Sequence, residues 1–391
     1  MGIAKNQGLE ADERGYVELG TFVCEECVED SFLKGIIRAA VDTKVCDYCG
    51  RKSKDPIAAP SSPVIDLIVA TVNYYFAEPA EAGVPYEKGY LVDSKETNEI
   101  LDDLGFECHV EFFKDVASVF NIEFWVPAAH GHWSSSHQHE ILHDSWMTFC
   151  LEVQHRTRFF FGETDSPDYG FNQEFAPKHM LPTLGRLVRD LNLVATLEQG
   201  QLLCRAREKP MEAKWTANGK TMGAPPPGRA RAGRMNPGGI SYLYLAFDKA
   251  TAVSEVVRSP PANLVIATFD VIRDIRVLDL SALPELPSLF DVDRRMIREG
   301  LLFLDRFVND ISQPVVKDGS EHVDYVPSQV ICEYFALIYT AADSRRLDGL
   351  VYPSARLPGG RNLVLFPTER GQGAKFDCVA FSGATEVACK N

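Results

Sequence analysis

Long hydrophobic runs are missing from this 391-residue sequence. No uninterrupted apolar stretch approaches the roughly 20 residues that a transmembrane helix requires. The N-terminal stretch MGIAKNQGLEADERGY also lacks the apolar core of a signal peptide. We therefore expect a cytoplasmic protein with no membrane partner.

Two common nucleotide-binding motifs are absent as well. The chain contains neither GxGxxG nor GxxxxGK[ST], the glycine-rich loops of Rossmann domains and of P-loop NTPases. Internal repeats and long low-complexity segments are also missing. These absences argue against a hydride-transferring Rossmann enzyme, a P-loop NTPase and a repeat protein.

Positive charge is scarce overall, because the net charge is −15. Lys and Arg supply most of the non-specific affinity for nucleic acid, so we do not expect a general nucleic-acid partner. Residues 201–240 are an exception, with eight Lys or Arg against Glu208 and Glu212. This basic segment suits a compact anion, although a solvated basic loop explains it equally well.

The composition is that of a folded protein, with 45% hydrophobic and 24% charged residues. We predict an α+β protein in three segments: 1–60 with a cysteine-rich zinc ribbon and a linker, 61–197 mainly helical, and 198–391 mixed. The helical spacing of Trp146, Phe149, Cys150 and Val153 predicts one helix in SWMTFCLEVQHRTRFFF. A second helix is predicted in LPTLGRLVRDLNL.

Short β-rich runs dominate the chain after about residue 199. They read GQLLCRAR, SYLYLAF, LVIATFDV, RVLDL, LDGLVYP, RNLVLF and FDCVAF. Gly- and Pro-containing loops separate them, and one long helix is expected around residues 291–311. Such a mixture indicates an α+β catalytic-type domain and not a doubly wound sheet.

Two cysteine pairs stand near the N-terminus. Their spacing is Cys24-x-x-Cys27, eighteen residues, and Cys46-x-x-Cys49. Each pair can present two thiolates to one ion, and the segment between them has room for a short helix in FLKGIIRAA. The pattern predicts a structural Zn²⁺ site whose four positions are all filled by protein, so that it performs no chemistry.

His139-Glu140-Ile141-Leu142-His143 matches the HExxH pattern of zinc proteases. Seven of the nine histidines lie between residues 109 and 155, which makes a chance match easy. No downstream third ligand with a known spacing follows. We therefore do not interpret this motif as a catalytic metal site.

The family signal lies in residues 224–257. There GRMNPGGISYLYLA, followed by Glu255, resembles the core of the RES domain, a family named for its Arg, Glu and Ser. LLCRAR, with Arg205, precedes this core. YVPSQVICEYF and LDGLVYPSARLPGGRNLVLF, with Ser354, follow it in the family's order, although Ser328 stands where Thr is more usual. The resemblance covers about residues 199–370.

The resemblance implies both a fold and a reaction. RES domains are typically bacterial toxins that degrade NAD⁺, with a fold similar to ADP-ribosyltransferases. The CEEC, CDYC and WMTFCLEVQHRTRFFF blocks resemble the HEPN-associated region that precedes some RES domains. The family therefore implies an NAD⁺ phosphorylase or glycohydrolase, for which NAD⁺ is the substrate and not a hydride cofactor.

Cleavage of the nicotinamide–ribose bond needs cations for the pyrophosphate, an aromatic wall and a carboxylate near the cationic centre. By the resemblance, Arg205 and Arg234 would bind pyrophosphate, Tyr244 would form the wall and Glu255 would face the ribose. The resemblance further gives Ser354 a substrate-orienting role and places Asn362 among the NAD⁺-binding residues. Arg207 is an alternative to Arg205 for binding pyrophosphate. The structural alternatives are a solvated loop residue for Arg234, a core residue for Tyr244 and a surface helix residue for Glu255.

Two other functions stay open at this point. The same cleft could transfer ADP-ribose to a macromolecule, since the acceptor alone separates that reaction from hydrolysis or phosphorolysis. The N-terminal half could instead belong to an RNA-processing or RNA-binding HEPN protein, although residues 64–195 lack the R-x₄₋₆-H pair of HEPN ribonucleases. A neutralising antitoxin or regulatory protein and a second copy of the chain are the candidate protein partners.

Overall fold

The computed structural model divides the chain into two compact units. The N-terminal unit comprises residues 1–140 and 286–299, and the sheet unit comprises residues 141–285 and 300–391. The structure describes residues 19–161, 176–210, 215–226, 228–257, 262–313, 321–341, 343–368 and 375–389. The segments 1–60, 61–197 and 198–391 stay a prediction; the compact units divide the chain at other points.

The N-terminal unit begins with a small cysteine-rich fold. Strand β1 (Phe22–Cys24) pairs antiparallel with β2 (Ala58–Pro60), and α2 (Ser31–Ala39) lies between them in the chain. Asp30 caps α2, because its side chain accepts a hydrogen bond from the Leu33 amide at 2.9 Å. Helix α2 confirms the short helix predicted between the two cysteine pairs.

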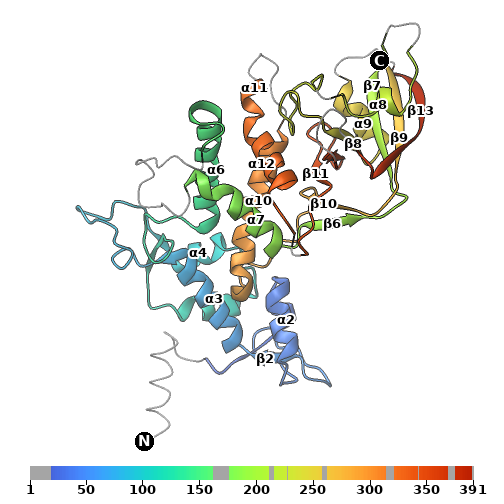
Figure 1. Ribbon diagram of the computed structural model, residues 1–391. Coiled ribbons are helices and arrows are strands. Elements are labelled where there is room, and N and C mark those ends of the chain that lie inside the picture. The colour runs from blue at the N-terminus through green and yellow to red at the C-terminus, as the bar shows by residue number, and fades with distance from the viewer. Residues whose placement is uncertain are drawn as a thin grey trace, which may run out of the picture. The chain divides into compact units, whose positions relative to one another are not determined.

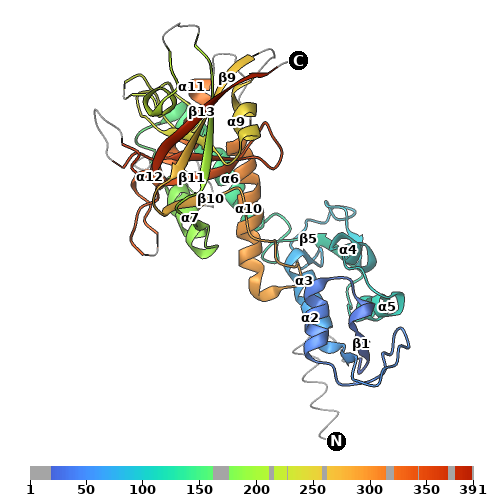
Figure 2. The same ribbon diagram turned by 90° about the vertical axis from the view of Figure 1, so that its right-hand side faces the viewer.

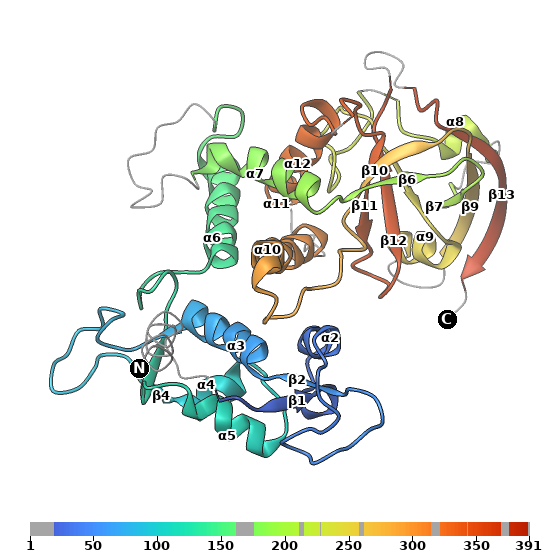
Figure 3. The same cartoon turned by 90° about the horizontal axis from the view of Figure 1, so that it is seen from below.

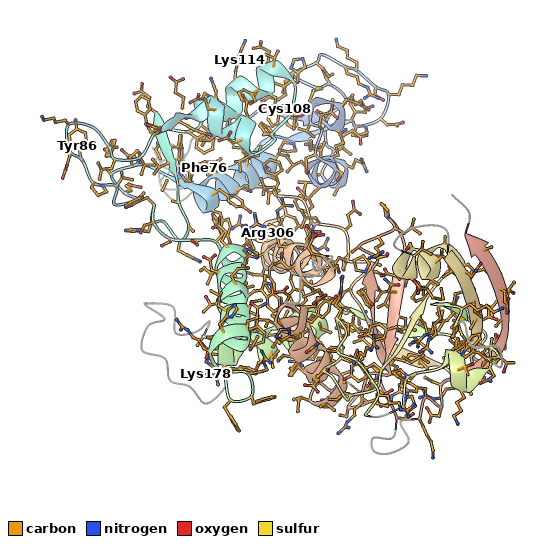
Figure 4. The ribbon with its side chains drawn as sticks, turned by 90° about the horizontal axis from the view of Figure 1, so that it is seen from above. Phe76, Tyr86, Cys108, Lys114, Lys178 and Arg306 are labelled. Carbon is orange, nitrogen blue, oxygen red and sulfur yellow. The ribbon has the colours of Figure 1, made fainter. Side chains whose placement is uncertain are left out.

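The rest of this unit is helical around a minor sheet. Its helices are α3 (Ser62–Tyr75), α4 (Thr97–Asp103) and α5 (Val110–Ser118). Strands β3 (Phe76–Ala77), β4 (Lys95–Glu96) and β5 (Phe124–Pro127) form a three-stranded sheet that the helical prediction missed. Phe76 is buried directly after α3, whereas Tyr86 is 69% exposed on the loop that follows β3 (Figure 4).

The sheet unit contains an eight-stranded mixed sheet in the order β13-β9-β7-β8-β12-β11-β10-β6 (Figures 2 and 3). Its strands are β6 (Val194–Leu197), β7 (Leu202–Glu208), β8 (Leu243–Ala246), β9 (Ala262–Val271), β10 (Ile275–Asp279), β11 (Gly349–Pro353), β12 (Arg361–Leu365) and β13 (Val379–Cys389). Only β10 and β11 pair in parallel among the described strands. All seven predicted β-runs are confirmed, and β6 is an addition.

Three helices of this unit, over residues 138–151, 177–190 and 295–312, were predicted from the sequence pattern. The helices of the unit are α6 (Gln138–Leu151), α7 (Pro177–Asp190), α8 (Gly219–Met222), α9 (Lys249–Val256), α10 (Arg295–Ser312), α11 (Glu321–Asp324) and α12 (Val326–Leu337), with α6 and α10 beginning in the N-terminal unit (Figure 1). Trp146 and Phe149 of the predicted apolar face are buried in α6, and Val153 is buried in the π-helical turn Glu152–Arg156 that follows. No helix of the described residues is long and apolar enough to cross a membrane.

The two faces of the sheet bury different side chains, because successive residues of a strand alternate between faces. Leu203, Leu243 and Leu363 share one face in a large aliphatic core. The opposite face carries the small residues Cys204, Ala206 and Ala246, against which Ala252 of α9 packs. Small side chains on this face leave room between the sheet and α9.

Candidate active site

A cavity of about 250 Å³ lies on the small-residue face of the sheet. Strands β7, β8, β11 and β12 and helix α9 all contribute to its lining. Its polar lining residues are Arg205, Tyr244, Glu255, Tyr352 and Asn362. Strands β7 and β8 share a single register pair, Cys204↔Ala246, so these neighbours part at the cavity. The fold thus brings together four of the residues that were predicted from the sequence, with Tyr352 in addition.

Glu255 is held by two hydrogen bonds to one carboxylate oxygen. Ser354 Oγ and Asn362 Nδ2 each donate to Glu255 Oε1 at 2.7 Å. The other oxygen, Oε2, has no hydrogen-bond partner among the described residues. Glu255 lies near the C-terminal end of α9 and is solvent-exposed, whereas Ser354 and Asn362 are buried. The carboxylate is therefore fixed in orientation with one oxygen left open.

Ser354 has no remaining hydrogen-bond capacity for a substrate. Its Oγ accepts from the backbone amides of Arg356 and Leu357, both at 3.2 Å, while its hydroxyl donates to Glu255. A hydroxyl offers one donor and two acceptor positions, so all three are in use. Ser354 thus acts through Glu255, and the substrate-orienting role expected for it would be indirect.

Arg205 lines the cavity and has one buried, unpaired donor. Strand alternation places its side chain on the face of Leu203, opposite to that of Cys204 and Ala206. The Nη1 of Arg205 is shielded from solvent and has no hydrogen-bond partner. Burial, reinforced by the neighbouring charge of Arg207, lowers the pKa of Arg205 to about 9. Arg207 differs, because its Nη1 donates to the Thr221 carbonyl at 2.7 Å and it does not line the cavity. Of these two arginines only Arg205 lines the cavity, and its binding of an anion stays a prediction.

Tyr244 lines the cavity but its hydroxyl is occupied. It donates to Asn236 Oδ1 at 2.7 Å and accepts from the Met235 amide at 3.0 Å. Burial raises the pKa of Tyr244 well above its ordinary value, so the phenol keeps its proton. Only the ring remains available to a ligand, which suits the predicted wall and not a polar contact.

Asn236 organises the loop that covers this tyrosine. Its Nδ2 donates to the carbonyls of Arg231, Pro237 and Ile240 at 2.9–3.0 Å. A Cβ at Gly233 would lie 2.7 Å from Asn236 Oδ1 and 2.9 Å from the Tyr244 hydroxyl, so only glycine fits there without movement. The sequence GRMNPGG is therefore a packing unit that fixes the Tyr244 side of the cavity.

Arg234, in the same loop, does not line this cavity. Its Nη1 donates to the carbonyls of Ile311 and Ser312 at the C-terminal end of α10. A cation at this position satisfies free carbonyls and complements the helix dipole. Arg234 lines a separate cavity of about 280 Å³ instead. Its predicted contact with pyrophosphate stays a prediction, and in this conformation its guanidinium caps a helix.

Two family models match the chain. Residues 202–382 match the RES domain, and residues 39–167 match HEPN/RES N-terminal domain 1. The protein carries a RES domain behind a HEPN/RES N-terminal domain 1. No curated protein and no solved structure matched the chain. Every polar residue that lines the cavity lies within the RES domain.

Tyr352 is the member of the RES cavity that the sequence analysis missed. It lies opposite Asn362 in the register of β11 and β12, on the cavity face. A signal for it was present, because Tyr352 precedes Ser354 by two residues in VYPS and strand alternation places such residues on one face. That spacing could not show that β12 pairs with β11 and places Asn362 opposite Tyr352.

The four predicted zinc ligands of the N-terminal unit come together. The metal-binding atoms of Cys24, Cys27, Cys46 and Cys49 lie within 4.8 Å of one another. The sulfur atoms of Cys24 and Cys49 are 3.6 Å apart, and those of Cys27 are 3.7 Å from Cys24 and Cys46. A tetrahedral ZnS₄ site with Zn–S of about 2.3 Å has sulfur atoms ~3.8 Å apart. The quartet fits one zinc ion with no open position.

Burial makes it unfavourable for the thiols of this cluster to lose their protons without a metal ion. Burial raises the pKa of Cys24 to about 11 and raises that of Cys27 further. Gly50, at φ +67°, provides the tight turn after Cys49, and its amide donates to the Cys46 carbonyl at 3.1 Å. Thiolates bind zinc, so a bound ion would replace the thiol protons and would link the Cys24–Cys27 segment to the Cys46–Cys49 segment.

His139 of the HEILH motif is engaged elsewhere. Its Nδ1 lies 2.7 Å from Glu299 Oε2, and its backbone amide donates to the same oxygen at 3.0 Å. Within the described residues the cysteine quartet is the one group with metal-binding geometry. His139 therefore serves a buried polar contact at the start of α6.

Proposed function

We propose that the RES domain cleaves the N-glycosidic bond between nicotinamide and ribose in NAD⁺, as an NAD⁺ phosphorylase or glycohydrolase. The arrangement of Glu255 carries the proposal: Glu255 lines the cavity, two donors hold its Oε1, and its Oε2 has no partner among the described residues. A carboxylate held in this way can stabilise positive charge without reorganising during the reaction.

The chemistry requires charge to move from the pyridinium ring to the ribose. When the bond between C1′ and the nicotinamide nitrogen breaks, its electron pair goes to the ring nitrogen and neutralises the pyridinium. The ribose becomes oxocarbenium-like, as in glycoside hydrolysis, and Glu255 stabilises it. Phosphate or water then forms the new bond to C1′ and loses a proton. Phosphate gives ADP-ribose-1″-phosphate, and water gives ADP-ribose.

The size and charge of the cavity suit one end of the dinucleotide. Its volume of about 250 Å³ lies just below the range of roughly 300–1,000 Å³ that is typical of ligand pockets. We therefore place the nicotinamide and its ribose in the cavity, with the Tyr244 ring as one wall. The Arg205 guanidinium would bind the pyrophosphate, because guanidinium groups form strong charge-assisted hydrogen bonds with phosphate oxygens.

The biological setting is also part of the proposal. Unrestrained loss of NAD⁺ would make the protein a toxin or defence effector in the cytoplasm, restrained by an antitoxin or a regulatory protein. A second copy of the chain is the other candidate partner. The Cys24–Cys27–Cys46–Cys49 cluster would hold a structural zinc ion. We assign the N-terminal unit no part in the NAD⁺ reaction.

The test is a product assay on the full-length protein with NAD⁺, with and without inorganic phosphate. We expect rapid nicotinamide release, and a loss of about 10²–10³-fold in kcat on Glu255→Ala, the range for removing one preorganised electrostatic group. Glu386→Ala is the matched control, because that exposed carboxylate pairs with Lys209. Mass spectrometry of the products distinguishes phosphorolysis from hydrolysis.

The same assay can overturn the proposal. Absence of nicotinamide release from the folded, zinc-loaded protein in both buffers would contradict NAD⁺ cleavage by this chain. Unchanged release by Glu255→Ala would contradict the assignment of the carboxylate. Transfer of ADP-ribose to an added protein mixture in place of free products would identify the ADP-ribosyltransferase alternative.

A further inference from the structure

The cavity contains two tyrosines whose hydroxyl groups differ in one respect. The Tyr244 hydroxyl has two hydrogen-bond partners, Asn236 and the Met235 amide. The Tyr352 hydroxyl has none among the described residues, although Tyr352 is only 7% exposed. Tyr352 itself lines the cavity. A largely buried polar group without a protein partner calls for an explanation.

Tyr352 stands next to the carboxylate network. It faces Asn362 across the β11–β12 register, and Asn362 donates to Glu255 Oε1. Tyr352 is close enough to Glu255 and Arg234 for both charges to act on its titration. Burial raises the pKa of its phenol above the ordinary value, so the hydroxyl is a donor at neutral pH. The neighbourhood therefore offers one free acceptor, Glu255 Oε2, and one free donor, the Tyr352 hydroxyl.

A vicinal diol matches this pair of free groups. One hydroxyl of a diol can donate to Glu255 Oε2, while the other, or the same oxygen, accepts from Tyr352. A simple carboxylate or phosphate ligand would be repelled by Glu255, and an apolar ligand would leave both groups unpaired. A ligand that only donates or only accepts would satisfy one group and leave the other without a partner.

We infer that Tyr352 is a further substrate-contacting residue, which together with Glu255 Oε2 binds the 2′,3′-diol of the ribose whose C1′ reacts. This inference rests on the proposed function and adds a ribose subsite to it. The subsite fixes C1′ relative to the carboxylate and makes the enzyme selective for a ribose over a deoxyribose. Tyr352 forms no covalent bond and transfers no proton in this role.

The test compares Tyr352→Phe with Tyr339→Phe. Tyr339 is a suitable control because its buried hydroxyl also lacks a partner but does not line the cavity. Binding is measured with carbocyclic NAD⁺, a non-cleavable analogue that keeps the diol, and kinetics are measured with NAD⁺ and its 2′-deoxy and 3′-deoxy analogues on the nicotinamide ribose. Thermal melting of each variant reports whether the fold is intact.

For Tyr352→Phe we expect about tenfold weaker binding of carbocyclic NAD⁺, the loss of one hydrogen bond worth ~1.4 kcal/mol. Wild-type protein should prefer NAD⁺ over at least one deoxy analogue, and Tyr352→Phe should lose most of that preference. Tyr339→Phe should change neither quantity. This pattern would support the ribose subsite, because a purely structural role would not alter the discrimination between ribose and deoxyribose.

Two results would overturn the inference in distinguishable ways. If the wild type cleaves NAD⁺ while Tyr352→Phe keeps its affinity and its ribose preference, the subsite is wrong and the proposed function stands. If the wild type neither binds carbocyclic NAD⁺ nor releases nicotinamide, both the proposed function and the subsite are wrong.

Discussion

The cysteine cluster of the N-terminal unit and the RES cavity use polar groups in opposite ways. Every thiol of the cluster lies near another thiol, at distances that one tetrahedral ion would satisfy. In the cavity, by contrast, Arg205 Nη1, Glu255 Oε2 and the Tyr352 hydroxyl have no partner among the described residues. The cluster is closed. The cavity leaves an acceptor and a donor without protein partners, whereas the Nη1 of Arg205 is unpaired but shielded from solvent.

This difference separates a structural site from a binding site on physical grounds. Buried polar groups are costly when unpaired, so a site that only stabilises the fold should pair all of them. A site that binds a ligand must leave some unpaired until the ligand arrives. The unpaired groups of the RES domain are a guanidinium nitrogen, a carboxylate oxygen and a phenol hydroxyl, and these are the groups that the proposed ligand would pair.

The largest effect is expected when a cysteine of the N-terminal cluster is replaced. Cys27→Ser should remove the zinc ion and unfold the cysteine-rich part of the N-terminal unit, because Cys27 is 2% exposed and structural zinc contributes ~10–16 kcal/mol in zinc-finger peptides. Zinc content by elemental analysis and hydrogen exchange of residues 19–60 measure the effect. Cys108→Ser is the control, since Cys108 belongs to the same unit but not to the cluster. Full zinc content in Cys27→Ser would contradict the tetrahedral assignment.

The next largest effect concerns Arg205, whose replacement should weaken NAD⁺ binding and raise the stability of the ligand-free protein. Arg205→Met should weaken NAD⁺ binding about 10–100-fold, since hydrogen bonds to charged groups contribute ~1.5–3 kcal/mol. The same substitution should raise the melting temperature of the ligand-free protein, because it removes a partly buried cation whose Nη1 is shielded from solvent and has no partner. Calorimetry with carbocyclic NAD⁺ and thermal melting measure the two effects.

The melting-temperature gain should depend on pH in a defined direction. Because the pKa of Arg205 in the folded state, about 9, lies below its ordinary value, the unfolded chain binds more protons between these values. Stability of the wild type therefore rises as the pH increases above about 9. The advantage of Arg205→Met should be full below pH 9 and shrink above it. A lower melting temperature for Arg205→Met at pH 7 would show that Arg205 has a structural partner.

The smallest effect tests the loop that forms one wall of the open site. Gly233→Ala places a Cβ against Asn236 Oδ1 and the Tyr244 hydroxyl, and overpacking of this kind costs ~1–3 kcal/mol. We expect a lower melting temperature and about a tenfold loss in kcat as the Tyr244 ring shifts. Gly238→Ala is the matched control in the same loop, because its nearest neighbour would be 3.9 Å away. Equal melting temperatures for the two variants would contradict the packing role of Gly233.

Much of the fold could be read from periodicity. Alternating apolar residues predicted seven of the eight strands of the large sheet, and helical spacing predicted α6, α7 and α10. The missed elements are short, such as β3, β4 and β6, which have two to four residues each. Their pairing depends on the strands beside them and not on a pattern of their own, so no local signal announces them.

Site residues were predictable where the motif was local. The spacing of Cys24, Cys27, Cys46 and Cys49 was enough to predict a metal cluster. Arg205, Glu255 and Ser354 came from ordered family blocks, and the cavity contains the first two. Arg234 shows the limit of this approach, since its block is present but its guanidinium caps α10, 77 or 78 residues away in sequence.

The sequence by itself determined most of the longer elements, the four clustered cysteines and the residue types that the proposed reaction uses, because these follow from periodicity, spacing and side-chain chemistry. Only the tertiary structure decided which polar groups are paired and which are free. Ser354 and Asn362 reach Glu255 across 99 and 107 residues, and Tyr352 becomes a cavity residue through its register with Asn362. Pairing depends on distances of about 3 Å between distant segments, and those distances exist only after the chain has folded.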